Sequence, residues 1–293
     1  MRTTATGISM AAVILSLTLG LTAADVTTAV GTWVDLLGQA KTAYAAGHYP
    51  EAERLYRATL EQLMPLEKKG PNLAEVWNNL GAQYQVMGRF ADAELSYKQA
   101  LAAWPDSPLY AGGAAKTAMN LAGVYRAQGK VNDAETLYRR TIPRLERAFG
   151  PDSTELAIGL ANFADMLRAQ RRLREAGEYA ERAIRIQERA TSETDPMLAP
   201  KLDIWASILL DSGRVDEAQS ALERARSLLE GAADTKLASI LNSLGMIATR
   251  LGRFSEAESY YRQALAIWRE VLGEKHERVA IGLNNLAQAV RLQ

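Results

Sequence analysis

Residues that could carry out catalysis are sparse in this chain of 293 residues. The two histidines, His48 and His276, lie far apart along a predicted linear stack of helices, and cysteine is absent. A shared metal site or a histidine-based catalytic triad requires such side chains to lie close together. The sequence also lacks a glycine-rich phosphate loop, an HExxH motif and a GxSxG motif. We therefore expect a protein that is not an enzyme and that uses no cofactor or metal.

Asparagine and arginine offer the most specific binding chemistry. An asparagine amide can donate to and accept from a peptide backbone at once, so it binds a ligand without depending on the ligand's side chains. Asparagine is also a mediocre helix former, so its recurrence within predicted helices needs a reason. The recurring asparagines, and the arginines that follow them on the same helix face, form the predicted peptide-binding site: Asn79, Asn120, Asn162, Asn285, Arg126, Arg168, Arg250 and Arg291.

The arginines of this set would favour carboxylates, and hence an acidic partner segment. Arg250 lies one position further along its helix than the others, and Ile204 interrupts the row of asparagines. An alternative remains open at this stage. The asparagines could instead bond to the neighbouring helix, and the arginines could simply be solvated.

The helices that would carry these residues are best defined in residues 76–105. One set of large and small residues there has the spacing that places it on one face of a first helix. A second set has the spacing that places it on one face of a second helix. The two sets are Trp77, Leu80, Gly81 and Tyr84, followed by Ala93, Tyr97 and Ala100. Gly88 lies between them, where a left-handed residue ends the first helix at least cost.

The same marks recur along the chain. The turn position falls at Gly47, Gly88, Gly129, Arg171, Gly213 and Gly252, at intervals of 41, 41, 42, 42 and 39 residues. An alanine follows five residues later each time, at Ala52, Ala93, Ala134, Ala176, Ala218 and Ala257. A near-constant period of this kind predicts a linear array of helical hairpins.

This spacing resembles that of the tetratricopeptide repeat (TPR). Over residues 73–293 the pattern is similar to kinesin-light-chain-type TPR units, on the basis of Gly282-Leu-Asn-Asn-Leu-Ala287 and of residues 253–265 followed by Leu272-Gly273. The likeness is weakest in the fourth unit, where Arg171 replaces the turn glycine, and in the fifth, where Trp205 and Leu209 replace leucine and tyrosine. The resemblance implies an all-α, right-handed α-α superhelical solenoid whose first helices line a concave groove. Such a groove holds an extended peptide or a partner's helix, and a histidine at the loop position of His276 has a structural role.

The predicted organisation is about six TPR hairpins plus a C-terminal single helix. The units cover residues 33–70, 73–108, 114–150, 156–195, 199–233 and 237–275, with a half unit at 278–293. Residues 1–24 carry one charge, an apolar stretch and small residues at Thr22 to Ala24, which is typical of a secretory signal peptide cleaved before Asp25. A retained signal anchor and a buried N-terminal helix are the alternatives. Residues 25–32 then form a short tether, and the protein is expected to be exported, either to the periplasm or to the exterior.

Composition limits the kinds of partner. Lysine plus arginine and aspartate plus glutamate each number 34, so the chain lacks the basic surplus of a general nucleic-acid binder. We expect a scaffold that binds a protein or peptide, and that meets a membrane only if the signal segment is retained. The rival prediction is a self-assembling structural or adaptor protein of the cell envelope. In that case Val279, Leu283, Leu286 and Val290 would cover the preceding unit, while Ala289 and Leu292 would face a second copy as a homo-oligomer contact.

Overall fold

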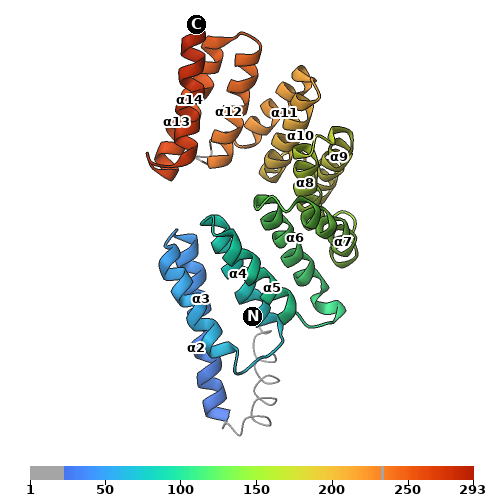
Figure 1. Ribbon diagram of the computed structural model, residues 1–293, viewed down its shortest axis with the longest axis vertical. Coiled ribbons are helices and arrows are strands. Elements are labelled where there is room, and N and C mark those ends of the chain that lie inside the picture. The colour runs from blue at the N-terminus through green and yellow to red at the C-terminus, as the bar shows by residue number, and fades with distance from the viewer. Residues whose placement is uncertain (1–22, 232–233) are drawn as a thin grey trace. The chain divides into compact units, whose positions relative to one another are not determined.

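The computed structural model describes residues 23–231 and 234–293, which form helices joined by tight turns and contain no β-strand (Figure 1). Most of the predicted signal peptide therefore lies outside the described residues. No helix of the described part is long and apolar enough to cross a membrane.

The chain divides into two compact units. The boundary falls between Arg144 and Leu145, inside a helix that also contains Pro143. Unit 1 contains α2 (Ala23–Ala45), α3 (Tyr49–Leu63), α4 (Pro71–Val86), α5 (Phe90–Ala103), the 3-10 helix η1 (Pro108–Tyr110), α6 (Ala111–Ala127) and most of α7 (Val131–Phe149). Unit 2 contains the end of α7 and α8 (Thr154–Ala169), α9 (Leu173–Ala190), η2 (Pro196–Leu198), α10 (Ala199–Asp211), α11 (Val215–Leu228), α12 (Thr235–Arg250), α13 (Phe254–Leu272) and α14 (Glu277–Leu292).

Successive helices pack as hairpins: α2 on α3, α4 on α5, α8 on α9, α10 on α11, and α12 on α13. Each hairpin also contacts the next within its unit, and α14 packs on α13 as a single helix. The predicted all-α solenoid of helical hairpins followed by one helix is therefore confirmed.

The turn residues have the backbone conformation that the sequence predicts. All six have a positive φ, from +62° at Arg171 to +80° at Gly213. In this conformation the amide after the turn reaches back to the first helix, as in the bond from Arg89 N to Tyr84 O, 2.8 Å long. The left-handed residue thus satisfies carbonyl groups that the end of the helix would otherwise leave unpaired.

The recurring alanines lie near the start of the second helix of each hairpin. All six are fully buried. In two hairpins an aromatic ring of the second helix also lies against a glycine of the first. A Cβ atom at Gly81 would lie 2.8 Å from the Tyr97 ring, and one at Gly245 would lie 2.6 Å from the Tyr261 ring. In these two hairpins a glycine allows the helices to pack closely, and the aromatic ring fills the space beside it.

Two details differ from expectation. Residues 25–32, expected to be a tether, are part of α2. In α14, Val279 and Ala289 are buried, whereas Leu283 and Val290 are 42% and 47% exposed, so the buried stripe is rotated from the predicted one.

The reason for the rotation is Gly282. The side chains of Leu265 and Trp268 lie within about 3 Å of the place where a Cβ atom would be at this position. The small face of α14 can therefore approach α13 more closely than a leucine face could.

Candidate functional site

We use the term first-helix face for the side of each first helix that points away from the second helix of its hairpin. The predicted site residues lie on this side. In unit 1 it includes Asn79, Asn120 and Arg126 on α4 and α6. The Nδ2 group of Asn120 donates to Oδ1 of Asn78, at 3.2 Å, and so connects α6 with α4. Asn79 and Asn120 are half-buried, and Arg126 is exposed.

Unit 2 repeats this bridge. Asn285 of α14 donates to Oδ1 of Asn242 on α12, at 2.9 Å, and the hydroxyl of Ser243 on α12 donates to Asp203 on α10, at 3.3 Å. The donors Asn120, Ser243 and Asn285 occupy the predicted asparagine position of their units. The acceptors Asn78, Asp203 and Asn242 each lie one residue before the same position in the preceding unit. Asn120 and Asn285 thus bond to the neighbouring helix, as the alternative reading of the sequence allowed, while Asn162 is exposed.

Each bridging amide retains part of its bonding capacity. Among the described residues, the carbonyl oxygens of Asn120 and Asn285 accept no hydrogen bond, and each Nδ2 group has one N–H left to donate. A bridge to the neighbouring helix therefore does not preclude contact with a ligand.

Asp203 gives this face of unit 2 a half-buried acidic residue. Burial raises its pKa, the nearby Asp165 adds to that effect, and the hydrogen bond from Ser243 together with Arg168 and Arg278 opposes it.

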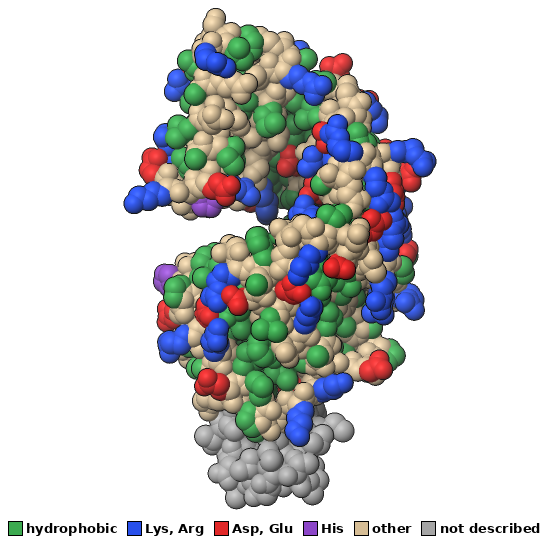
Figure 2. Space-filling view, viewed as in Figure 1, with side chains coloured by type: hydrophobic (Ala, Val, Ile, Leu, Met, Phe, Trp, Pro, Cys, Tyr) green, Lys and Arg blue, Asp and Glu red, His purple; other side chains and the backbone are tan. Residues whose placement is uncertain are grey.

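The arginines of the predicted site differ from one another. Arg168 forms ion pairs with Asp165 at 3.2 Å and with Asp211 at 3.0 Å. Burial alone would lower the pKa of Arg168, but these two carboxylates raise it. Arg168 is therefore partly exposed and already paired with two carboxylates, whereas Arg250 and Arg291 are exposed. Figure 2 shows acidic side chains interspersed among the basic ones over α7 and α9.

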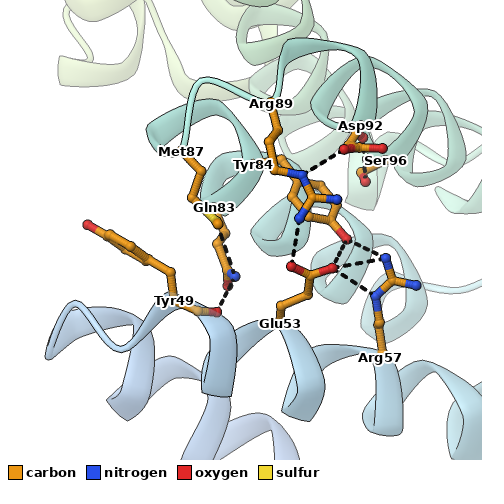
Figure 3. Close-up of polar contacts among 9 residues, drawn as sticks. All are labelled: Tyr49, Glu53, Arg57, Gln83, Tyr84, Met87, Arg89, Asp92 and Ser96. Atoms are coloured by element: carbon orange, nitrogen blue, oxygen red, sulfur yellow. Dashed lines mark hydrogen bonds and ion pairs between the residues drawn. The ribbon is translucent and has the colours of Figure 1, made fainter.

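A set of polar contacts that sequence reasoning missed joins the first and second hairpins (Figure 3). The Tyr84 hydroxyl, on a side chain that is almost fully buried, donates to Glu53 Oε1 at 2.9 Å and accepts from Arg57 at 2.9 Å. Arg89 donates to Glu53 Oε2 at 2.8 Å and lies 4.3 Å from the centroid of the Tyr84 ring. We call this arrangement a polar clamp.

A second polar clamp joins the next pair of hairpins. Glu94 accepts from Lys98 and from Lys130, both at 2.6 Å, and Lys130 lies 5.4 Å from the centroid of the Tyr125 ring. Burial by itself would raise the pKa of Glu94, but its hydrogen bonds from Lys130 and Lys98 lower it to about 2. The signal was present in the sequence as a glutamate after the buried alanine, a tyrosine four residues before the turn, and a basic residue just after it.

The two histidines have no catalytic surroundings. His276 Nδ1 accepts from the backbone N–H of Arg278 at 3.2 Å and so caps α14. This is the structural role that the resemblance implied. His48 is an exposed turn residue before α3. Within the described residues, no three acidic or histidine side chains are grouped so that they could hold a metal ion.

Stacked hairpins with left-handed turns and small-residue seams define an α-helical repeat protein of the TPR class. The MalT-like TPR region matches residues 38–240, and a tetratricopeptide repeat model matches residues 236–293. The chain belongs to the MalT-like TPR family. Proteins with the TPR fold generally mediate protein–protein interactions or act as scaffolds, and they are generally non-catalytic.

Solved structures support the fold. BtubC (BKLC) from P. vanneervenii is 22% identical, with a TM-score of 0.56 over 85% of this chain and 93% of that one. A putative kinesin light chain from Podospora anserina is 19% identical, with a TM-score of 0.53 over 64% and 89%. The APC/C hetero-tetramer Cut9–Hcn1 contains a chain that is 12% identical, with a TM-score of 0.64 over 97% of this chain and 46% of that chain. No curated protein matches the sequence.

Proposed function

We propose that this protein is a non-catalytic scaffold that binds an extended or helical segment of a partner protein on its first-helix faces. The observation that carries the proposal is the bridging amide. Asn120 and Asn285 hold neighbouring first helices together and still present an oxygen at a half-exposed surface, where a peptide backbone can donate to it. In unit 1, Asn79 and Asn120 lie on the first helices of successive hairpins, a spacing that suits a ligand running along the array.

The preference for an acidic segment now rests on fewer residues. Arg168 is already paired with two aspartates, and the half-buried Asp203 lies on the same face of unit 2. Any attraction for carboxylates therefore falls to the exposed residues Arg250 and Arg291. Assembly with another protein is a known use of this helical arrangement, because one of the similar chains is part of the Cut9–Hcn1 hetero-tetramer.

The proposed place of action is outside the cytoplasm, after removal of residues 1–24. The partner is identified by affinity capture with the mature chain from the native extracytoplasmic fraction, followed by mass spectrometry. Affinity for the purified partner is then measured for the double variant Asn79→Ala/Asn120→Ala. We expect binding to weaken by about tenfold or more, because two backbone contacts are lost.

A matched control separates binding from stability. Asn78→Ala removes the same bridge between α4 and α6 but leaves the Asn120 amide in place, and it should cost about 1 kcal/mol of stability with little loss of affinity. Asn132→Ala, on the exposed start of α7, should change neither quantity. If the double variant binds as tightly as the wild-type chain, these asparagines are not part of the site.

A second candidate function is self-assembly within the cell envelope. It is favoured by the exposed apolar residues of α14, where Leu283, Val290 and Leu292 are each more than 40% exposed. Light scattering on the mature chain tests it. A molar mass that rises with concentration supports assembly, and a monomer at every concentration rejects it.

A further inference from the structure

The seam between α9 and α11 in unit 2 has no polar clamp. Gly177 stands at the position of Glu53, and Leu209 stands at the position of Tyr84. Arg214, at the position of Arg89, pairs with Glu217 of its own hairpin. The acid and the hydroxyl that fill this seam in unit 1 are therefore both absent here.

Trp205 occupies part of the space instead. A Cβ atom at Gly177 would lie only 3.3 Å from Cζ3 of Trp205, so the glycine allows the indole ring to lie against α9. The Arg214 guanidinium lies 5.7 Å from the centroid of this ring. The indole does not fill the seam, and a cavity of about 450 Å³ remains, open to solvent. We call it the α9–α11 pocket.

The α9–α11 pocket is apolar inside and charged at its rim. The side chains of Ile184, Leu202, Trp205 and Leu209 line it, and Ala221 of α11 is also part of the wall. Leu202 and Leu209 are buried members of the unit 2 core. An opening onto core leucines differs from a groove lined by polar side chains, because an entering apolar group would bury part of its surface against apolar side chains.

The charges at the rim are already paired with one another. Arg185 pairs with Glu181 at 3.4 Å, and Arg224 pairs with Glu188 at 2.8 Å. Together with the pair between Arg214 and Glu217, this leaves the rim neutral overall. A charged ligand would have to displace one of these pairs, so the complementary ligand is a neutral, apolar group.

We propose that the α9–α11 pocket binds an apolar side chain, of leucine or phenylalanine size, that projects from a partner protein. The volume lies within the usual range for binding pockets, and a single buried anchor of this kind commonly dominates an interface. The site uses residues of α9, α10 and α11 other than those of the predicted asparagine row. It is therefore independent of the proposed function.

The test is an NMR titration of the intact chain, following the Trp205 indole N–H signal, which is assigned by its disappearance in Trp205→Phe. The probes are N-acetyl-L-leucinamide and N-acetyl-L-phenylalaninamide, with N-acetyl-L-glutaminamide as the polar comparison. We expect the two apolar probes to give saturable shifts with dissociation constants of about 1 mM, as suits one anchor residue alone. The glutamine derivative should give no saturable shift.

Two variants of α11 test the location. Ala221→Phe fills the pocket and should weaken binding of both apolar probes by about tenfold or more. Arg226→Phe places the same side chain on the opposite side of α11 and should leave binding unchanged. Thermal melting of both variants confirms that each is folded.

Three results would overturn the proposal. The first is normal binding of the apolar probes to Ala221→Phe, and the second is binding of the glutamine derivative as tight as that of the leucine derivative. A Trp205 signal that shifts with protein concentration alone would identify a second copy of the chain as the occupant. The double variant Asn79→Ala/Asn120→Ala should keep normal titrations, so this proposal and the proposed function fail separately.

Discussion

Arg171 carries a side chain where the other turns of the array use glycine. Its φ of +62° lies in the left-handed region, where a Cβ atom crowds the backbone. The Arg171 side chain, which is 70% exposed, forms an ion pair with Asp211. An exposed pair of this kind contributes little to stability.

We therefore predict that Arg171→Gly raises the free energy of unfolding by about 0.5 kcal/mol, since relief of strain outweighs the greater freedom of glycine in the unfolded chain. The reverse change, Gly213→Arg, should lower it by about 1 kcal/mol. Urea denaturation of the two variants provides the measurement. A loss of stability in Arg171→Gly would show that the ion pair matters more than the backbone conformation.

Glu94 makes stability depend on pH. Its pKa is about 2 in the folded chain, compared with an ordinary value of 4.5. A carboxyl group with a lowered pKa contributes stability above its unfolded pKa, and this contribution is lost as the pH falls from about 4.5 towards 2. We predict that Glu94→Gln costs about 1 kcal/mol at neutral pH and reduces the loss of stability over this interval.

Urea denaturation at a series of pH values measures this effect. Glu75→Gln is the matched control, because Glu75 is exposed on α4. Equal acid sensitivity of Glu94→Gln and the wild-type chain would remove the second polar clamp as its source.

First helices differ in how much space separates them from the neighbouring side chains. The space around two glycines, Gly123 and Gly245, shows this difference. Gly123 of α6 has room for a methyl group, since the nearest atom to an added Cβ would be 3.7 Å away. Gly245 of α12 has none, because the Tyr261 ring would be 2.6 Å away. The two positions therefore separate helix propensity from packing.

We predict that Gly123→Ala stabilises the chain by about 0.5–1 kcal/mol, through the better helix propensity of alanine. Gly245→Ala should destabilise it by about 1–3 kcal/mol, because the Tyr261 ring must move. Thermal melting of both variants checks the signs. Two stabilising substitutions would mean that α12 and α13 can separate without cost.

At the scale of the whole molecule, export remains a prediction from residues 1–24. If the signal peptide is cleaved as expected, protein recovered from the extracytoplasmic fraction begins at Asp25. Intact-mass spectrometry decides this directly. Ala24→Arg should block cleavage, because signal peptidase reads a small residue there, and the uncleaved chain should remain with the membrane fraction. A mature wild-type chain that begins at Met1 would contradict the prediction.

The sequence by itself determined the repeat: its period, its six turn residues and its six buried alanines. These features are local, since a positive φ and a shared helix face depend on residues a few positions apart. It also pointed to Asn120 and Asn285 as special, but their partners Asn78 and Asn242 lie on other helices and were not anticipated.

Only the tertiary structure decided which side chains of neighbouring hairpins meet. It joined Glu53 to Tyr84 and Arg89, paired Arg168 with Asp211 of the next hairpin, and rotated α14 about its small-residue face. It also opened the α9–α11 pocket where Gly177 and Leu209 replace a clamp. The physical reason is that contacts between hairpins depend on packing distances of a few ångströms, which small residues set and a periodic pattern does not encode.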